Sequence, residues 1–168
     1  MATPTSVSAN LERVDYGSPV GSIQLGQHRQ VISEGVATRQ LTARESGSLC
    51  CFDRAAGVVY TLPTPVKGMY FDFVATVSVT SNAYKTITKT IASEFLVGGI
   101  GILSLTVAEA GDFFAANGTT HVAISEDGAT KGGLIGGSYR LTAISATQWA
   151  ITGISVGAGT LADPFATS

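Results

Sequence analysis

The chain has 168 residues, of which 45% are hydrophobic and 13% are charged, and its formal net charge is −2. This length suits one domain with its own core and an extension, while the charged fraction falls well below the roughly 25% of soluble domains. Such a surface favours a protein that packs against other subunits over a freely diffusing monomer. Because the lysines and arginines are scattered singly, nucleic acid is not expected as a direct partner.

The sequence shows neither of two features that would direct it into a membrane or out of a cell. Its first residues lack a positive region followed by an apolar one, which a secretory signal would have. The longest mostly apolar stretch, residues 95–107, is too short and too rich in glycine to span a bilayer. We therefore expect a protein that is made in a cytoplasm, stays soluble there and has no membrane partner.

Residues 1–35 differ in texture from the rest of the chain. They contain Pro4, Pro19 and several glycines, with almost no sustained apolar periodicity, which is typical of extended, turn-rich backbone. The segment is either an extended N-terminal arm that becomes ordered on a neighbour or a plain disordered terminus. We divide the chain into this arm (1–35), a β-domain (36–156) and a C-terminal tail (157–168).

From residue 40 onward, short β-rich runs alternate with turn residues. The runs 49–52 and 58–62 are predicted to form a hairpin across a connection that ends in Gly57. The run 69–80 is predicted to be the longest strand, with one buried face. Its alternate positions are all apolar: Met69, Phe71, Phe73, Ala75, Val77 and Val79.

Two more hairpins are predicted in the second half. Asn117-Gly118 is the strongest short hairpin signal and would join 113–116 to 120–124. The runs 139–144 and 148–152 would pair across a three-residue turn, with Trp149 in the core. Because no window sustains a helical period, we predict an all-β fold. The expected form is a single antiparallel β-sandwich or barrel, jelly-roll-like, with the extended N-terminal arm.

Cys50 and Cys51 are adjacent in one predicted strand. Neighbours in a strand point to opposite faces, so we expect two small hydrophobic side chains, one in the core and one facing out. A strained vicinal disulfide is the weaker alternative, since disulfides are rare in the cytosol.

No catalytic, cofactor-binding or metal site is assigned, and the protein is not expected to be an enzyme. His28 and His121 have no metal-ligand spacing to other side chains, and His121 is expected to face solvent or a subunit contact. The glycine-rich segments 98–101 and 132–137 do not open a helix after a strand. They are predicted to be flexible or tightly turning loops.

The acidic residues are also scattered. Glu126-Asp127-Gly128 is the one turn where acid oxygens would suit calcium, but a solvated hairpin tip is the favoured interpretation. Catalysis by paired acids needs two carboxylates facing across a cleft, and no pair is indicated by the sequence.

Three short motifs in the first half of the β-domain are similar to a pattern found in a known protein family. They are Leu-Thr-x-x-x-Ser-Gly at 41–47, Ala-Ala-Gly at 55–57 and Thr-Leu-Pro-x-Pro at 61–65. With segments 117–122 and 144–149 they resemble the small capsid decoration (cement) proteins of tailed bacteriophages. The resemblance spans about residues 38–154.

This resemblance implies a β-sandwich on the outside of a phage head. Its partners would be the phage major capsid protein and copies of itself, often as a homotrimer, and no catalytic residue carries over. The protein would be made in the bacterial host cytoplasm and reside on the capsid surface of the virion. The binding parts are expected to be the N-terminal arm and the glycine-rich segments 98–101 and 132–137.

A receptor- or glycan-binding module of a phage fibre or spike is the alternative. Sugars stack on exposed aromatic rings, so this alternative requires such rings outside the core. The candidates are Tyr16, Tyr84 and Tyr139.

Overall fold

The computed structural model describes residues 12–14, 23–25, 29–107 and 110–168. The chain divides into two compact units, Met1–Gln30 and Val31–Ser168. In the first unit, β1 (Glu12–Val14) pairs antiparallel with β2 (Ile23–Leu25). The predicted arm at 1–35 falls mostly on residues outside the described ranges, and so do His28 and Tyr16.

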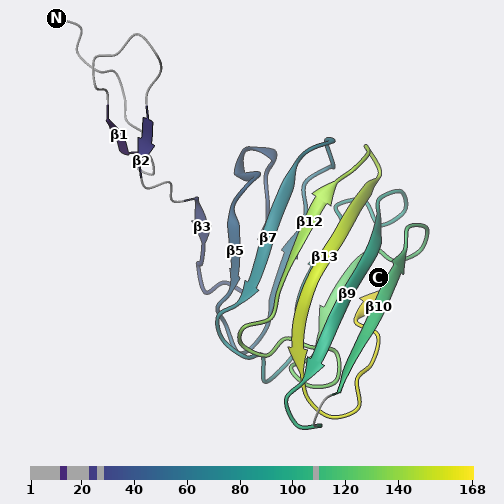
Figure 1. Cartoon of the computed structure of the whole chain (residues 1–168). Coiled ribbons are helices and arrows are strands. Elements are labelled where there is room, and N and C mark those ends of the chain that lie inside the picture. Colours follow the sequence, from purple (N-terminus) through teal and green to yellow (C-terminus); the bar gives the residue numbers. More distant parts are fainter. Residues whose placement is uncertain (1–11, 15–22, 26–28, 108–109) are drawn as a thin grey trace, which may run out of the picture. The chain divides into compact units, whose positions relative to one another are not determined.

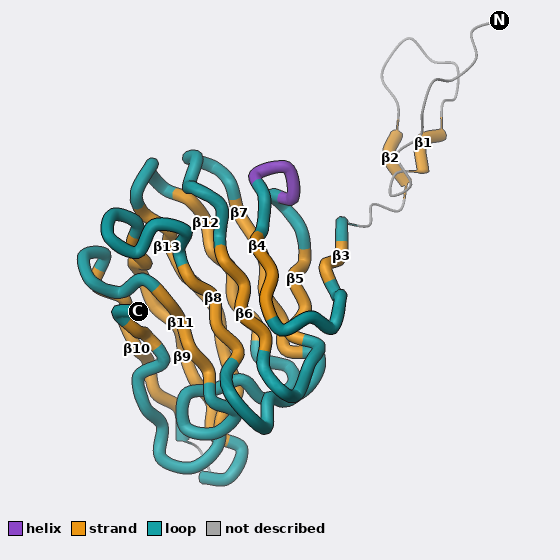
Figure 2. The backbone as a smooth tube through the Cα atoms, turned by 180° about the vertical axis from the view of Figure 1, so that it is seen from behind, coloured by secondary structure: helices purple, strands orange, loops and turns teal. Residues whose placement is uncertain are grey.

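The second unit contains two β-sheets that share one core (Figures 1 and 2). Across the larger sheet the strands are β10 (Gly111–Asn117), β9 (Phe95–Ser104), β13 (Gln148–Gly157), β12 (Ser138–Ala143), β7 (Tyr70–Ala75), β5 (Leu49–Phe52) and β3 (Val31–Ile32). Across the smaller sheet they are β14 (Phe165–Ala166), β11 (Ala123–Glu126), β8 (Tyr84–Ile87), β6 (Val58–Thr61) and β4 (Thr38–Gln40). The all-β prediction is confirmed. Among the described residues the single helical element is the 3₁₀ turn η1 (Ala43–Glu45), and no helix has the length and apolar character to cross a membrane.

From β3 to β8, successive strands alternate between the two sheets. Neighbours within each sheet are therefore parallel, β3–β5–β7 in one and β4–β6–β8 in the other. The predicted hairpin of 49–52 with 58–62 is wrong, because β5 and β6 lie in different sheets. The prediction of antiparallel sheets is wrong for the same reason, and both sheets are mixed. The turn residues at 53–57 suit a crossing between sheets as well as a hairpin, which is why the sequence pattern predicted the wrong strand pairing.

The second half contains one predicted hairpin and lacks the other. β12 pairs antiparallel with β13, with Ala143 opposite Trp149, as expected. The Asn117-Gly118 hairpin is wrong, because β10 pairs with β9 while β11 pairs with β8 and β14. The Asn117 side-chain oxygen accepts hydrogen bonds from the amides of Thr119, at 3.0 Å, and Thr120, at 2.9 Å. This Asx-type turn leads the chain into the other sheet.

The predicted strand at 69–80 is confirmed only in its first part. The inward side chains of β7, among them Phe71 and Phe73, are buried as the alternation required. The strand ends after Ala75, because the amides of Thr76 and Val77 both donate to the carbonyl of Phe52, at 3.1 and 3.2 Å. Val77 is consequently 39% exposed.

Aromatic rings from both sheets meet in the core. The Phe52 ring centroid lies 5.5 Å from that of Tyr60 and 4.6 Å from that of Tyr84, both in the smaller sheet. It also lies 5.8 Å from the ring of Phe73 in its own sheet. Such pairs add about 1 kcal/mol each to the apolar burial. Trp149 is fully buried, as predicted.

Both cysteines are free and buried. They point to opposite sides of β5, as expected, but the cysteine on the outer side is covered as well and does not face solvent. Cys50 points into the core, and Cys51 lies on the opposite side of β5, where Ser33, just after β3, forms a hydrogen bond with its side chain. Burial raises the pKa of both thiols.

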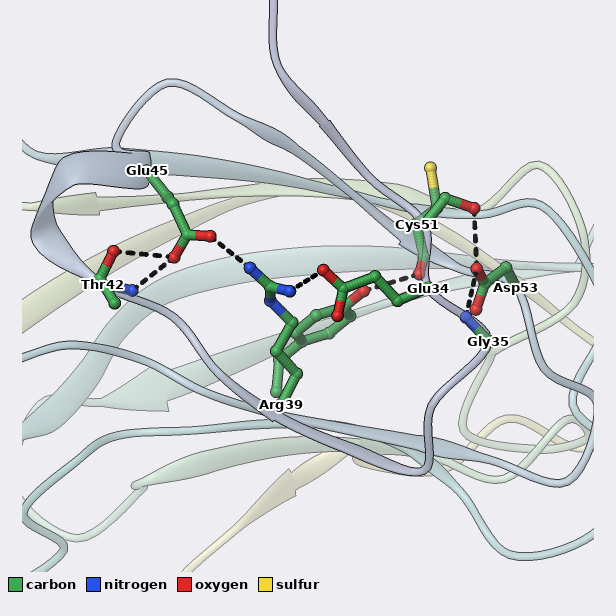
Figure 3. Close-up of polar contacts among 9 residues, drawn as sticks. Glu34, Gly35, Arg39, Thr42, Glu45, Cys51 and Asp53 are labelled. Carbon is green, nitrogen blue, oxygen red and sulfur yellow. Dashed lines mark hydrogen bonds and ion pairs between the residues drawn. The ribbon is translucent and has the colours of Figure 1, made fainter.

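A polar clasp holds the first residues of this unit against both sheets (Figure 3). The Arg39 guanidinium bridges the carboxylates of Glu34 and Glu45, and the Asp53 carboxylate accepts from the Ser33 hydroxyl at 2.7 Å and the Gly35 amide at 3.0 Å. At the other end of the chain, β14 pairs with β11. The predicted domain boundaries at 36 and 156 differ from this arrangement, since β3 precedes the first and β14 follows the second.

The backbone of β9 depends on a glycine where the strand passes β13. Gly98 has φ +106°, and a Cβ there would lie 2.6 Å from the carbonyl oxygen of Ile151. Gly98→Ala should lower the free energy of unfolding by about 3 kcal/mol or more, from backbone strain plus overpacking. Gly68→Ala is the matched control, because Gly68 has φ +93° and open space around it. It should cost about 1 kcal/mol. Denaturant unfolding measures both, and equal costs would contradict the described packing of β9.

Candidate interaction surface

The outer face of the larger sheet is assigned by the strand register. Alternate residues point to opposite faces, and the intervening side chains, such as Phe73 and Tyr139, are buried in the core. One row across the outer face contains Phe113, Gly101, Ile154, Ser138 and Val74. The next row contains Ala115, Gly99, Thr152, Arg140 and Asp72. Most of these side chains are small, so few of them project far from this face.

β9 and β13 end and β10 begins at one end of this face (Figure 1). Large apolar side chains gather there. Phe113 is 86% exposed, Leu103 49% and Ile154 52%. The loops at the same end add Leu105, Val107 and Ile135, which are also exposed. We call these six residues the apolar end surface. Exposed apolar groups gathered in this way mark interaction sites on soluble proteins.

Glycines form the floor beneath Phe113. The predicted loop at 98–101 is wrong, because these residues lie within β9 and pair on both sides with β10 and β13. A Cβ at Gly101 would lie 3.0 Å from the Phe113 ring, so the missing side chain lets that ring lie over β9. Glycine carries no side chain to show a period of two, which is why the strand was not recognised in the sequence.

The open edge of the larger sheet is protected against strand addition. At the two ends of β10, the residues whose backbone groups bond to β9 are even-numbered, Ala110 and Gly118. Because the backbone groups of successive residues in a strand point in alternate directions, the amides of odd-numbered residues in β10 point to the open edge. The amide of Phe113 donates to the Asp112 carboxylate at 2.8 Å, and the amide of Asn117 donates to Nδ1 of His121 at 3.2 Å. Two backbone amides at this edge thus already donate to side chains, which disfavours pairing with a strand of another molecule. At this side of the larger sheet, the outer face is therefore better suited to a partner than the β10 edge.

His121 has a structural role in this arrangement. Its ring stacks on Phe165 with centroids 5.6 Å apart, besides accepting the Asn117 amide. Across the parts of the chain that the structure describes, no three His, Cys, Asp or Glu side chains gather as metal ligands.

The charges on the outer face neutralise one another. The Arg140 guanidinium donates to both Asp72 carboxylate oxygens, at 2.7 and 2.8 Å, and lies 4.7 Å from the centre of the Tyr70 ring. An exposed pair of this kind adds little to stability. It does remove net charge from the face, which lowers the cost of covering it with another protein.

A buried carboxyl lies between the sheets at the same end of the molecule. The expectation of a solvated tip at residues 126–128 is wrong for Glu126, which is only 3% exposed. The Ser155 hydroxyl donates to Glu126 Oε1, and the Gly133 amide donates to Ser155 Oγ at 3.2 Å. Burial raises the pKa of Glu126 to about 7.

The loop that follows Glu126 is shaped to cover this carboxyl. The Asp127 carboxylate accepts the amides of Ala129 at 2.8 Å and Lys131 at 2.9 Å, which curls the loop. Gly132 has φ +88°, and a Cβ there would lie 2.3 Å from Ser155 Oγ. The prediction of a tightly turning loop at 132–137 is therefore confirmed, and packing over Glu126 explains its glycines.

No protein-family model, no curated protein and no solved structure matches this chain. The surfaces of this chain and the motifs at 41–65 in its sequence are the features that point to a function.

Glu126 makes the stability of the protein dependent on pH. Its folded pKa of about 7 exceeds the ordinary 4.5, so its contribution is complete below about pH 4.5 and is lost as the pH rises through about 7. Wild type should lose about 3 kcal/mol from this group over that range. Glu126→Gln should not show this loss in denaturant titrations across the same pH values. Parallel pH profiles for the two proteins would contradict the buried-carboxyl account.

Proposed function

We propose that the protein is a structural virion component, a capsid decoration (cement) protein. It binds the outer surface of a tailed-phage head and stabilises the major capsid subunits, without catalysing a reaction. The observation that carries this proposal is the weakly charged outer face of the larger sheet, which ends in the apolar end surface. The resemblance over residues 38–154 supplies the phage setting.

The physical properties of the face suit permanent coverage by protein. Interface cores are depleted in charge and enriched in aromatic side chains, and Phe113 is an exposed aromatic on a floor of glycine. Binding across joints between capsid subunits stabilises the assembled state by mass action. Many copies on one shell multiply that effect.

Further parts of the proposal concern assembly. The protein forms a homotrimer, and residues 1–35 act as an extended arm that orders on a capsid neighbour. Its location is the capsid surface of the virion, after synthesis in the host cytoplasm, with neither nucleic acid nor membrane as partner. A jelly-roll-like relationship is proposed for the sandwich, and the antiparallel pairs β7–β12–β13, β9–β10 and β8–β11–β14 support it.

Recognition of a receptor or glycan is the second candidate. Tyr84 and Tyr139 do not serve it, because both rings are buried in the core. Phe113 and Tyr70 are the exposed rings among the described residues of Val31–Ser168. Tyr70 lies beneath Arg140, so Phe113 is the ring that most favours this candidate. Glycan-array binding by the isolated protein that Phe113→Ala abolishes would favour this candidate over the first.

Binding to heads tests the proposal through the apolar end surface. Purified protein should bind expanded heads that lack it and raise their resistance to heat or low salt. Phe113→Asp should weaken this binding about tenfold or more, because the carboxylate must lose its water in the interface. Phe113 is 86% exposed, so the variant should fold as wild type does.

Val66→Asp is the matched control, since Val66 is 61% exposed and its loop lies at the opposite end of the larger sheet. It should bind as wild type does. Equal binding by Phe113→Asp and wild type would remove the apolar end surface from the interface. Heads that are equally robust with and without the protein would overturn the stabilising role.

A further inference from the structure

The loop at 127–137 is attached to three other parts of the molecule. It connects β11 to β12, and its Gly133 carbonyl accepts the amide of Val79 at 3.1 Å. The amide of Leu134 donates to the Val156 carbonyl at 3.0 Å, and the amide of Gly136 donates to the Ala75 carbonyl at 2.9 Å. The loop is also bonded to the segment after β13, where the amides of Ala158 and Ala162 donate to the carbonyls of Ala129 and Thr130, and its Ile135 amide donates to Ser78 Oγ. Its closed position is therefore held by hydrogen bonds that lie outside the strand ladders, to the ends of β7 and β13, to the segment after β13 and to Ser155.

Glu126 lies directly under this loop. A Cβ at Gly132 would come within 3.0 Å of the carboxyl oxygen, and a Cβ at Gly133 within 3.0 Å of the Glu126 Cβ. The glycine backbone thus covers the carboxyl and excludes water from it. The chain of bonds from the Gly133 amide through the Ser155 hydroxyl to Glu126 connects loop, β13 and β11.

The groups around Glu126 offer its charge no cation. Asp127, next to it, adds a second negative charge. The phenols of Tyr84 in β8 and Tyr139 in β12 lie close enough to feel the carboxylate charge. β13 supplies the neutral Ser155, and the loop supplies backbone amides. Among the described residues, ionisation therefore places an unpaired negative charge in the interior, which is costly unless water reaches it.

We propose that residues 127–137 form a pH-dependent latch, closed while Glu126 is protonated and released when Glu126 ionises. Release exposes the carboxylate to water, and the glycine-rich loop can move without unfolding the sheets. Ile135, in this loop, is part of the apolar end surface and is 60% exposed. Opening the latch displaces Ile135 and weakens docking, a consequence that depends on the proposed function.

Amide hydrogen exchange on the isolated full-length protein tests the latch without any capsid. Between about pH 5 and about pH 8, the opening equilibrium of residues 128–137 should rise about 50-fold in wild type, after correction for intrinsic exchange. Glu126→Gln should show no such rise. Asp127→Asn is the matched control, because its side-chain oxygen can still accept the two loop amides; it should keep a rise with pH, smaller than that of wild type because one charge beside Glu126 is removed. Equal pH dependence in wild type and Glu126→Gln would overturn the latch.

Binding to heads at the same two pH values tests the consequence separately. Wild type should bind more weakly at the higher pH, and Glu126→Gln should bind equally at both. If exchange shows the latch but head binding by wild type does not change with pH, the latch does not regulate docking. Absence of head binding at either pH would instead overturn the proposed function and leave the exchange result standing.

Discussion

The ring of Phe52 lies between the two sheets and contacts aromatic side chains from both. Its centroid is 4.6 Å from that of Tyr84, with the ring planes 16° apart. From β3 to β8 the chain passes from one sheet to the other after every strand, so in this half the sheets are joined by these crossings and by the core that they share. The aromatic side chains of Phe73, Tyr60 and Tyr139 point into this core. The outer face of the larger sheet therefore contains mostly small residues and a few exposed apolar groups.

That division of side chains connects fold to function. The inner face buries large rings, while the outer face places glycine and alanine in the rows around Arg140. Phe113 is exposed even though Phe114, its neighbour in β10, packs against the core. A monomer would gain nothing from such an exposed ring, whereas a subunit covered by its neighbours would. Strand addition at β10 is disfavoured, since Asp112 and His121 accept hydrogen bonds from two of its edge amides.

The sequence allowed prediction of features that depend on local alternation, and failed where distant segments decide. The inward side chains at 69–75 and the hairpin around Trp149 follow from a period of two and a short turn. The crossings between sheets after β5 and β10 could not be predicted from local sequence, because turn residues suit a hairpin and a crossing between sheets equally. The glycine-rich residues 98–101 show no period, and Glu126 is buried by a loop and a strand that adjacent residues do not reveal. The apolar end surface was missed because its members lie on different strands.

The central claim is that the outer face of the larger sheet is covered by other protein chains on a phage head. An electron cryomicroscopy map of an intact head carrying this protein tests it most directly. The account predicts the outer face of β9, β10 and β13 against a neighbouring subunit, with Phe113 in the contact. A map in which this face points into solvent, with the protein held elsewhere, would contradict the claim.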